Sequence, residues 1–164
     1  MVERALGWRS ALFAEAVDIY KNHHRQNLVF RSVLYPSVKE TLQYFKAIPM
    51  AVITNKSSEF CSPLLEGLGI SQNFKIVVGA DYGLPLKPAP DAILNIMEKF
   101  NTPKERTVIV GDSLTDINAG KAAGVITCAV TYGFRTEEEL INAVPDFLIH
   151  NFSELRKLFS PRKP

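Results

Sequence analysis

The chain has 164 residues, a formal net charge of +2 at pH 7, 46% hydrophobic residues and 22% charged residues. This length suits one domain with a core of its own, and the composition is ordinary for a soluble globular protein. The near-neutral charge argues against a nucleic-acid-binding surface, and no apolar run approaches the roughly 20 residues of a membrane-spanning helix. The N-terminal residues lack a signal-peptide core, and Cys61 and Cys128 are expected to be buried free thiols. We therefore expect a cytoplasmic location.

Hydrophobic spacing predicts helices that alternate with short apolar strands along most of the chain. The expected helices span residues 5–26, 38–47, 59–67, 92–100, 116–123, 137–142 and 152–159. The expected strands span residues 50–54, 75–79, 107–111, 126–130 and 147–149. Ser37 and Asp91 are expected to cap the helices that follow them. This order predicts an α/β fold, a Rossmann-like parallel sheet with helices on both faces.

The stretch at residues 107–124, TVIVGDSLTDINAGKAAG, joins a buried strand to a helix through an acidic turn. Ligands of open parallel sheets bind just beyond the carboxyl ends of the strands. Two carboxylates held there, Asp112 and Asp116, suit a hard cation such as Mg²⁺. In the alternative interpretation, Asp112 only caps the helix and Asp116 is a solvated residue of its first turn.

Polar side chains follow two further strands at the same edge of the expected sheet. Thr54 and Asn55 end one strand, and Lys87 lies in the loop after the next. A hydroxyl, an ammonium and a pair of carboxylates together suit a phosphate and a divalent ion. Taken singly, Thr54 has a simpler interpretation as an ordinary strand end, and Lys87 as a solvated loop charge.

Three motifs resemble those of the haloacid dehalogenase superfamily, in its phosphoglycolate phosphatase-like branch. They are VITNKS at 52–57, LKPAPD at 86–91 and VGDSLTDINAGKAAG at 110–124. Weaker similarity extends the resemblance over residues 34–159. It implies a Mg²⁺-dependent phosphomonoesterase that hydrolyses a small organic phosphate through an aspartyl phosphate. The resemblance implies that Thr54 and Lys87 are catalytic. It also implies that these two residues bind substrate together with Asn55. Asp112 and Asp116 would support Mg²⁺.

The first motif of that family, Asp-x-Asp-Gly-Thr, is absent from the sequence, since no two aspartates are separated by one residue. Its strand supplies the nucleophile in the family and lies between the strands expected at 50–54 and 107–111. We therefore expect these two strands not to be properly paired. We expect residues 1–30 to be the C-terminal remnant of a helical cap and residues 31–164 to be the core of an N-terminally truncated protein, inactive by itself.

Two classes of function remain open at this point. The first is the phosphatase, with a small phosphorylated metabolite as its partner and no nucleic acid or membrane. The second is a non-catalytic module that binds Mg²⁺ and phosphate or another polypeptide. Either could self-associate or take up a missing N-terminal segment in trans.

Overall fold

The computed structural model describes residues 12–30 and 32–160. The chain divides into two compact units, residues 1–33 and 34–164. The expected boundary at residue 30 lies close to this division, and the identity of the first unit as a cap remnant stays a prediction.

The described part of the first unit is one helix, α2 (Phe13–Gln26). It forms the later part of the helix expected at 5–26, whose first residues, 5–11, lie outside the described range. Glu15 in its first turn and basic residues in its last turn complement the helix dipole. No described residue of α2 is buried, and Ile19 is 63% exposed. Its apolar residues therefore contribute little to a core in the described part of the chain.

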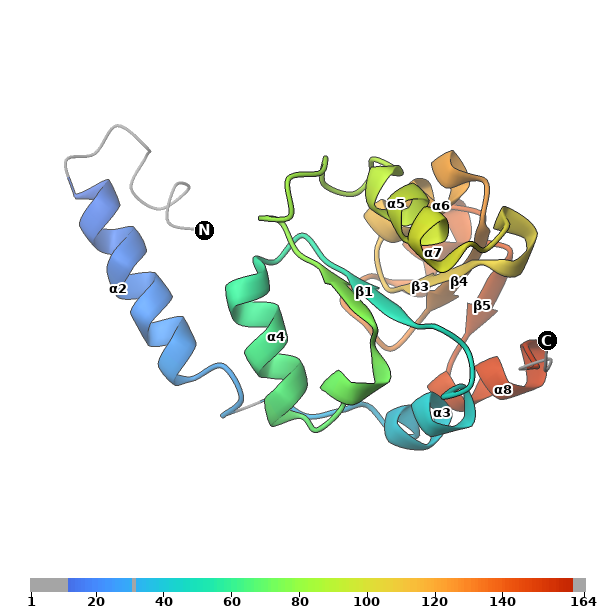
Figure 1. Ribbon diagram of the computed structural model, residues 1–164, viewed down its shortest axis with the longest axis horizontal. Helices are drawn as coiled ribbons and strands as arrows, with labels where there is room; N and C mark the ends of the chain where they lie inside the picture. Colours follow the sequence, from blue (N-terminus) through green and yellow to red (C-terminus); the bar gives the residue numbers. More distant parts are fainter. Residues whose placement is uncertain (1–11, 31, 161–164) are drawn as a thin grey trace. The chain divides into compact units, whose positions relative to one another are not determined.

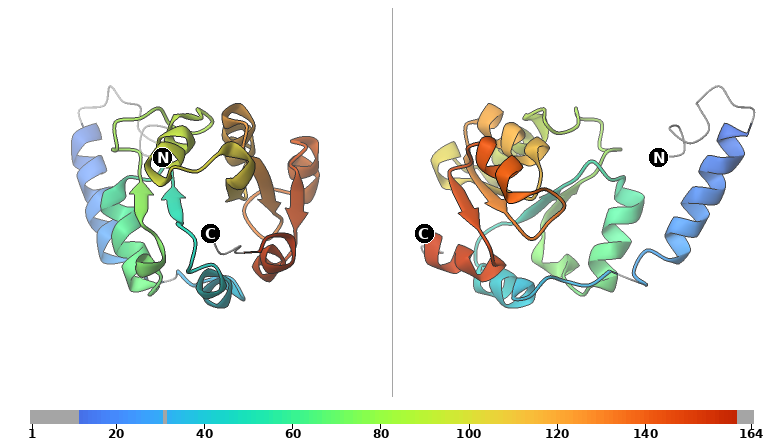
Figure 2. Two further views of the ribbon diagram at one scale, coloured as in Figure 1. Left: turned by 45° about the vertical axis from the view of Figure 1, so that its right-hand side comes forward. Right: turned by 180° about the vertical axis from the view of Figure 1, so that it is seen from behind.

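The second unit contains two parallel sheets (Figure 1). In the first, β1 (Ala51–Ile53) pairs with β2 (Ile76–Val78). The second has the order β3 (Val108–Gly111), β4 (Ile126–Val130) and β5 (Phe147–Ile149). Within the described residues no ladder joins β1 to β3, which confirms that these strands are not paired with each other. The left view of Figure 2 shows β1 and β2 side by side and apart from β4 and β5.

Helices follow most strands, as the alternation predicted. The helices of this unit are α3 (Val38–Tyr44), α4 (Ser58–Gly67), α5 (Asp91–Phe100), α6 (Leu114–Ala123), α7 (Glu137–Asn142) and α8 (Leu155–Leu158). Short 3-10 turns lie at Ser71–Asn73, Lys104–Arg106 and Phe152–Glu154. The helix expected at 152–159 is therefore a 3-10 turn followed by one turn of α-helix. No described helix is long and apolar enough to cross a membrane.

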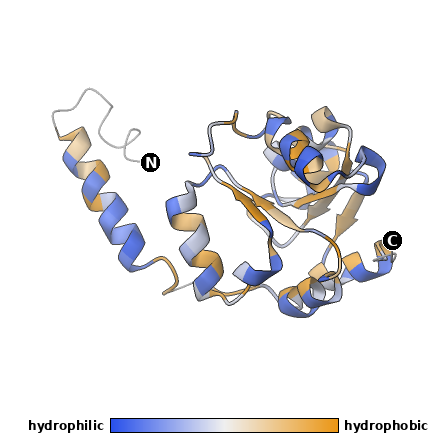
Figure 3. Ribbon diagram, in the orientation of Figure 1, coloured by the Kyte–Doolittle hydropathy of each residue, from blue (hydrophilic) through white to orange (hydrophobic). Residues whose placement is uncertain are grey.

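Helices cover both faces of the strands. On one face, residues of α5 and α6 pack with Ile53 of β1 and Ile109 of β3 in a single cluster. On the other face, Met50 and Val110 pack against a cluster that contains Phe45 and residues of β4, β5 and α8. Figure 3 shows the strands of both sheets as hydrophobic. The two sheets are thus joined through side chains of helices, in an α/β arrangement with parallel strands.

The close fit of α6 on its sheet depends on one glycine. A Cβ atom at Gly120 would lie 2.5 Å from Cγ2 of Ile109 and 2.6 Å from Cγ2 of Thr127. Both neighbours are β-branched side chains on strands, so they have little freedom to move away. The absence of a side chain at Gly120 lets α6 approach β3 and β4.

Two of the expected helix caps are wrong. Ser37 stands at the N-cap of α3, but its φ is 65° and its side chain makes no capping hydrogen bond. A capping side chain normally belongs to a residue in the extended region, and the left-handed backbone of Ser37 departs from that geometry. The N-cap of α5 is Pro90, and Asp91 is the first residue of the helix.

Candidate active site

Lys87 connects the two sheets at the carboxyl ends of their strands. Its Nζ donates a hydrogen bond to the carbonyl oxygen of Ile53, at 2.8 Å, and forms an ion pair with Oδ1 of Asp116, at 2.5 Å. The Lys87 and Asp116 side chains are only 11% and 9% exposed. The interpretation of Lys87 as a solvated loop charge is therefore wrong.

Asn55 fixes the main chain of Lys87. Its Nδ2 donates to the carbonyl oxygen of Lys87 at 2.9 Å, and its Oδ1 accepts from the amide of Lys87 at 3.1 Å. The two residues are 32 positions apart in sequence. Because both polar atoms of the Asn55 amide contact the Lys87 backbone, this residue holds the loop against the end of β1.

Asp116 is part of the cap of α6. Its Oδ2 accepts from the amide of Ser113 at 3.1 Å and from the Ser113 hydroxyl at 2.5 Å, while the Ser113 hydroxyl accepts from the Asp116 amide at 3.4 Å. This reciprocal arrangement is a capping box. A Cβ at Gly111 would lie 2.4 Å from Cβ of Asp116, so the glycine makes room for the carboxylate. The alternative roles of Asp112 as the cap and Asp116 as a solvated residue are therefore both wrong.

Asp112 contacts the loop that follows β4. Its Oδ2 accepts from the backbone amide of Phe134 at 2.9 Å. Gly133 packs so closely on Asp112 that a Cβ there would lie 2.2 Å from Asp112 Cβ. The Phe134 side chain is 95% exposed. Asp112 therefore fixes this loop while its other carboxylate oxygen remains available for a ligand.

Tyr132 lies in the same loop and stacks at an angle on Tyr35, with 4.8 Å between ring centroids. Burial is the largest cause that raises the pKa of Tyr132, and the nearby charge of Asp112 adds to it. Its phenol is therefore neutral at physiological pH.

Thr54 and its neighbours form the turn between β1 and α4. The amide of Thr54 donates to the carbonyl oxygen of Val78, at 2.9 Å, which continues the ladder with β2. Its Oγ1 accepts from the amide of Lys56 at 3.0 Å. The half-buried hydroxyl of Thr54 thus has a fixed acceptor side, and its proton can be donated to a ligand.

Asp81, which belongs to none of the three sequence motifs, stabilises the start of α4. Its two carboxylate oxygens accept from the amide of Ser58, at 2.8 Å, and from the Ser58 hydroxyl, at 2.5 Å. These hydrogen bonds lower the pKa of Asp81 to about 2. Ser113 was also overlooked, although its spacing from Asp116 is a sequence signal for a capping box.

The structure thus brings Lys87, Asn55 and Asp116 into direct contact. In the described residues no hydrogen bond or ion pair joins Thr54 or Asp112 to these three. No group of three or more His, Cys, Asp or Glu side chains in the described part could hold a metal ion. The available oxygen ligands therefore fit a metal ion only in part. Asp112 retains a free carboxylate oxygen. In Asp116, one oxygen is bound by Lys87 and the other by Ser113.

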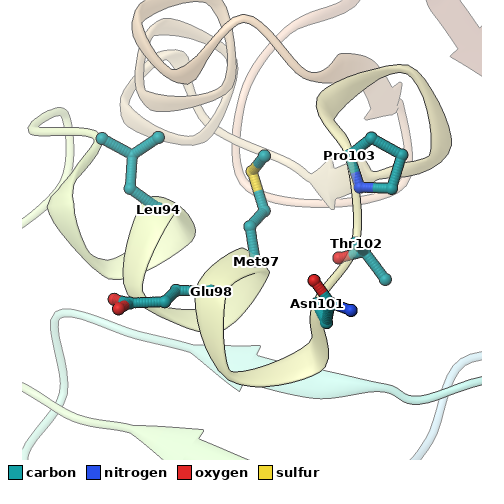
Figure 4. Close-up of a pocket in the computed structure, with 6 residues that line it drawn as sticks. All are labelled: Leu94, Met97, Glu98, Asn101, Thr102 and Pro103. Atoms are coloured by element: carbon teal, nitrogen blue, oxygen red, sulfur yellow. The ribbon is translucent and has the colours of Figure 1, made fainter.

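A pocket elsewhere on the unit contains none of these residues (Figure 4). It lies along α5 and the turn that follows, and it is lined by Leu94, Met97, Glu98, Asn101, Thr102 and Pro103. Its lining includes one carboxylate and no lysine or arginine, so it lacks a cation that could bind phosphate.

Comparison with known proteins identifies the class. The family model for haloacid dehalogenase-like hydrolases matches residues 4–130, and the chain belongs to this family.

Within this family, the chain is similar to several phosphoglycolate phosphatases. The chain is 38% identical over 162 residues to a phosphoglycolate phosphatase of Photorhabdus laumondii, an alignment that covers 94% of this chain and 69% of that protein. It is 34% identical over 165 residues to a phosphoglycolate phosphatase of Pectobacterium atrosepticum, covering 96% and 70%. The crystal structure of a predicted phosphoglycolate phosphatase from Haemophilus somnus superposes with a TM-score of 0.89 at 29% identity, over 96% of this chain and 75% of that one.

Proposed function

We propose that this chain supplies the phosphate-binding and charge-stabilising part of a Mg²⁺-dependent phosphomonoesterase of the phosphoglycolate phosphatase-like type. The observation that carries this proposal is the buried ammonium of Lys87, held at the carboxyl edge of the strands by Ile53 and Asp116. A fixed cation at that edge can stabilise negative charge that develops on a phosphoryl group. The two phosphoglycolate phosphatases described above support a small phosphorylated metabolite as the substrate.

The described residues take separate roles in this proposal. Lys87 offsets charge on the phosphoryl oxygens, and the Thr54 hydroxyl donates to one of them. Asn55 holds the Lys87 backbone and so positions the ammonium. Asp112 is the direct candidate ligand for Mg²⁺, and Asp116 supports it through water while it holds Lys87. When bound, Mg²⁺ would neutralise phosphoryl charge.

The nucleophile is the part that this sequence does not supply. None of its six aspartates belongs to an Asp-x-Asp-Gly-Thr motif. Without an attacking carboxylate, electrostatic stabilisation by Lys87 has no reaction to accelerate. We therefore propose that the 164-residue chain alone does not hydrolyse phosphate esters.

The test compares the 164-residue chain with a longer version that begins with an Asp-x-Asp-Gly-Thr strand and a complete cap. Phosphate release from phosphoglycolate and from p-nitrophenyl phosphate is measured with Mg²⁺. Only the longer version should turn over, and Lys87→Ala or Asp112→Asn in it should reduce turnover by roughly 10²-fold or more. Lys104→Ala, an exposed lysine in the turn before β3 and therefore at the opposite end of that strand, is the matched control and should change little. Turnover by the 164-residue chain that Asp112→Asn abolishes would contradict the proposal.

A non-catalytic Mg²⁺- and phosphate-binding module is the second candidate, favoured by the absence of a nucleophile from the sequence. Mg²⁺ prefers six oxygen ligands and keeps several waters, and Asp112 offers one free carboxylate oxygen. We expect millimolar affinity or weaker in calorimetry, abolished by Asp112→Asn. A micromolar site in this chain would contradict that expectation.

We also infer a cytoplasmic location. Cys61 and Cys128 are both free and buried, as expected from the sequence, and free thiols are usual in a reducing compartment.

A further inference from the structure

The turn that carries Thr54 is held by the segment that follows β2. The amide of Ala80 donates to the carbonyl oxygen of Lys56 at 3.0 Å. A Cβ atom at Gly79 would lie 2.5 Å from the amide nitrogen of Ser58. Figure 1 shows this segment beside the turn between β1 and α4. Because Gly79 is buried and has no side chain, the two backbones can approach each other directly.

Asp81 adds a side-chain contact to this backbone contact. One of its carboxylate oxygens accepts from the amide of Ser58 at 2.8 Å, and the other accepts from the Ser58 hydroxyl at 2.5 Å. Ser58 is the first residue of α4, so its amide has no partner within the helix. A carboxylate at this end of a helix is also stabilised by the helix dipole. Asp81 therefore fixes the end of the turn at which α4 begins.

The contacts of this turn lead back to the hydroxyl of Thr54. Its Oγ1 accepts from the amide of Lys56 at 3.0 Å, and the carbonyl oxygen of the same Lys56 accepts from Ala80. The orientation of the Thr54 hydroxyl therefore depends on the position of the Lys56 backbone. Lys56 lies between Thr54 and Ser58, so it keeps this position while both ends of the turn are held.

The other part of the turn is held by the same segment, further along the chain. Asn55 bonds to the amide and the carbonyl oxygen of Lys87, as described above. Among the described residues, no hydrogen bond joins Asp81 to Thr54 or to the Lys87 side chain. Asp81 can therefore act on a ligand of Thr54 and Lys87 only through the position of the turn.

We propose that Asp81 is a positioning residue of the phosphate site: it holds Ser58 and thereby keeps the Thr54 hydroxyl in place for a phosphoryl oxygen. This role rests on the proposed function, because it requires that Thr54 and Lys87 bind phosphate. The negative charge of Asp81 by itself would repel a bound phosphate. The positioning contact strengthens phosphate binding instead, so the sign of the effect separates the two.

The test uses the 164-residue chain and inorganic phosphate at neutral pH, constant ionic strength and without a metal ion. Binding is followed by NMR through the backbone amides of Thr54, Asn55 and Lys87. The unchanged chain should bind millimolar phosphate, and Lys87→Met should weaken this binding about tenfold. Asp81→Ala removes both hydrogen-bond acceptors of Ser58 and should weaken phosphate binding about fivefold. Stronger phosphate binding by Asp81→Ala would show that only the charge matters and would overturn the proposal.

The conservative variant Asp81→Asn separates the hydrogen bond from the charge. Its amide oxygen can still accept from the Ser58 amide, although the charge is lost as in Asp81→Ala. We expect its phosphate affinity to stay within about twofold of that of the unchanged chain. Equal losses in the two variants would exclude the bond to the Ser58 amide as the cause. Ile149→Val, a buried truncation on β5, is the control for stability: it should lower the melting temperature and leave phosphate affinity unchanged.

A double-mutant cycle tests whether Asp81 acts through Thr54. Thr54→Val removes the hydroxyl, keeps the β-branched shape and should weaken phosphate binding about fivefold. Asp81→Ala should add little to this loss, because the group that Asp81 positions is then absent. Full additivity of the two losses would overturn the assigned route. If Asp81→Ala fails to fold, Ser58→Ala removes one of the two bonds and should weaken phosphate binding about twofold; an unchanged affinity would overturn the proposal.

Phosphate binding by the unchanged chain separates a failure of this role from a failure of the proposed function. If the unchanged chain does not bind phosphate, or if Lys87→Met leaves the affinity unchanged, the proposed function fails and the role of Asp81 fails with it. If Lys87→Met weakens binding while Asp81→Ala does not, the role of Asp81 alone is overturned.

Discussion

Strands β3 and β4 are both short apolar runs in the same sheet, yet they differ sharply in burial. Thr127, Cys128 and Ala129 of β4 are all 0% exposed, whereas Val108 of β3 is 37% exposed and the rest of β3 is only half-buried. Among the described residues, β4 has a hydrogen-bonded neighbouring strand on each edge, and β3 has one on a single edge. The comparison shows that an apolar sequence is not enough to bury a strand. Its residues become fully buried where neighbouring strands pair with both of its edges.

The polar groups of β4 also differ from those at the end of β1. On β4, the buried Thr127 donates its amide and its hydroxyl to Oδ2 of Asp146, at 2.8 and 2.7 Å. On the same strand, burial raises the pKa of the Cys128 thiol to about 12, so that it stays protonated. At the end of β1, by contrast, a charged side chain satisfies an open-edge carbonyl. The strand that is paired on both edges thus buries polar groups that are neutral or hydrogen-bonded. The unpaired edge of β1 instead uses a charged side chain as the hydrogen-bond donor to its backbone carbonyl.

The largest effect is expected where α6 meets the completed side of the sheet. Gly120→Ala would place a Cβ at 2.5 Å from Ile109 and should cost about 3 kcal/mol, because neither strand nor helix can shift freely. Urea unfolding measures the change. Ala122→Ser, at an exposed position of the same helix, is the control and should be nearly neutral. A neutral Gly120→Ala would show that this side of the sheet is packed as loosely as the open edges.

The comparison between strands is tested by the same truncation on each. Val130→Ala on β4 removes methyl groups from a side chain that is 7% exposed and should cost roughly 2 kcal/mol. Val108→Ala on β3 should cost less than about 1 kcal/mol, because that side chain is already partly in water. The free energies of unfolding of both variants are measured under one set of conditions. Equal losses would contradict the link between edge pairing and burial.

Elements with strong local signals could be predicted from the sequence to the residue. Strand β4, helix α7 and strand β5 have the predicted bounds. Local patterns do not determine long-range contacts: Lys87 and Asp116 are 29 residues apart, and their ion pair depends on how the loop crosses the end of β1. The sequence placed both residues at the site but could not show that they contact each other.

The caps were missed for a related reason. A residue type such as Ser or Asp favours capping, but the backbone angle decides whether it can cap, and neighbouring contacts set that angle. At Ser37 this angle is left-handed, and at the start of α4 the stabilising carboxylate comes from Asp81, 23 residues further along the chain.

A smaller effect, visible through pH, is expected at Asp81. The folded-state pKa of about 2 lies below the usual 3.8, so Asp81 contributes stability above about pH 4 that is lost as the pH falls through 2. Asp81→Asn should therefore lower the melting temperature at pH 6, and the difference from the unchanged protein should vanish near pH 2. Ser58→Ala removes the hydroxyl donor but keeps the amide and should give an intermediate profile. A constant difference over this range would exclude the carboxylate as the cause.

The smallest effect is expected at Ser37, which lies before α3 with φ of 65°. A side chain costs energy in this left-handed region and glycine avoids most of that cost. The Ser37 side chain makes no capping bond that would be lost, so Ser37→Gly should raise the free energy of unfolding by about 0.5 kcal/mol after the greater entropy of unfolded glycine is included. Asn101→Gly at φ of 49° is the matched control, and its gain should be smaller because asparagine tolerates this region. Both changes are measured by urea unfolding. A loss of stability in Ser37→Gly would mean that the serine has a compensating contact and that the left-handed backbone is not the source of strain.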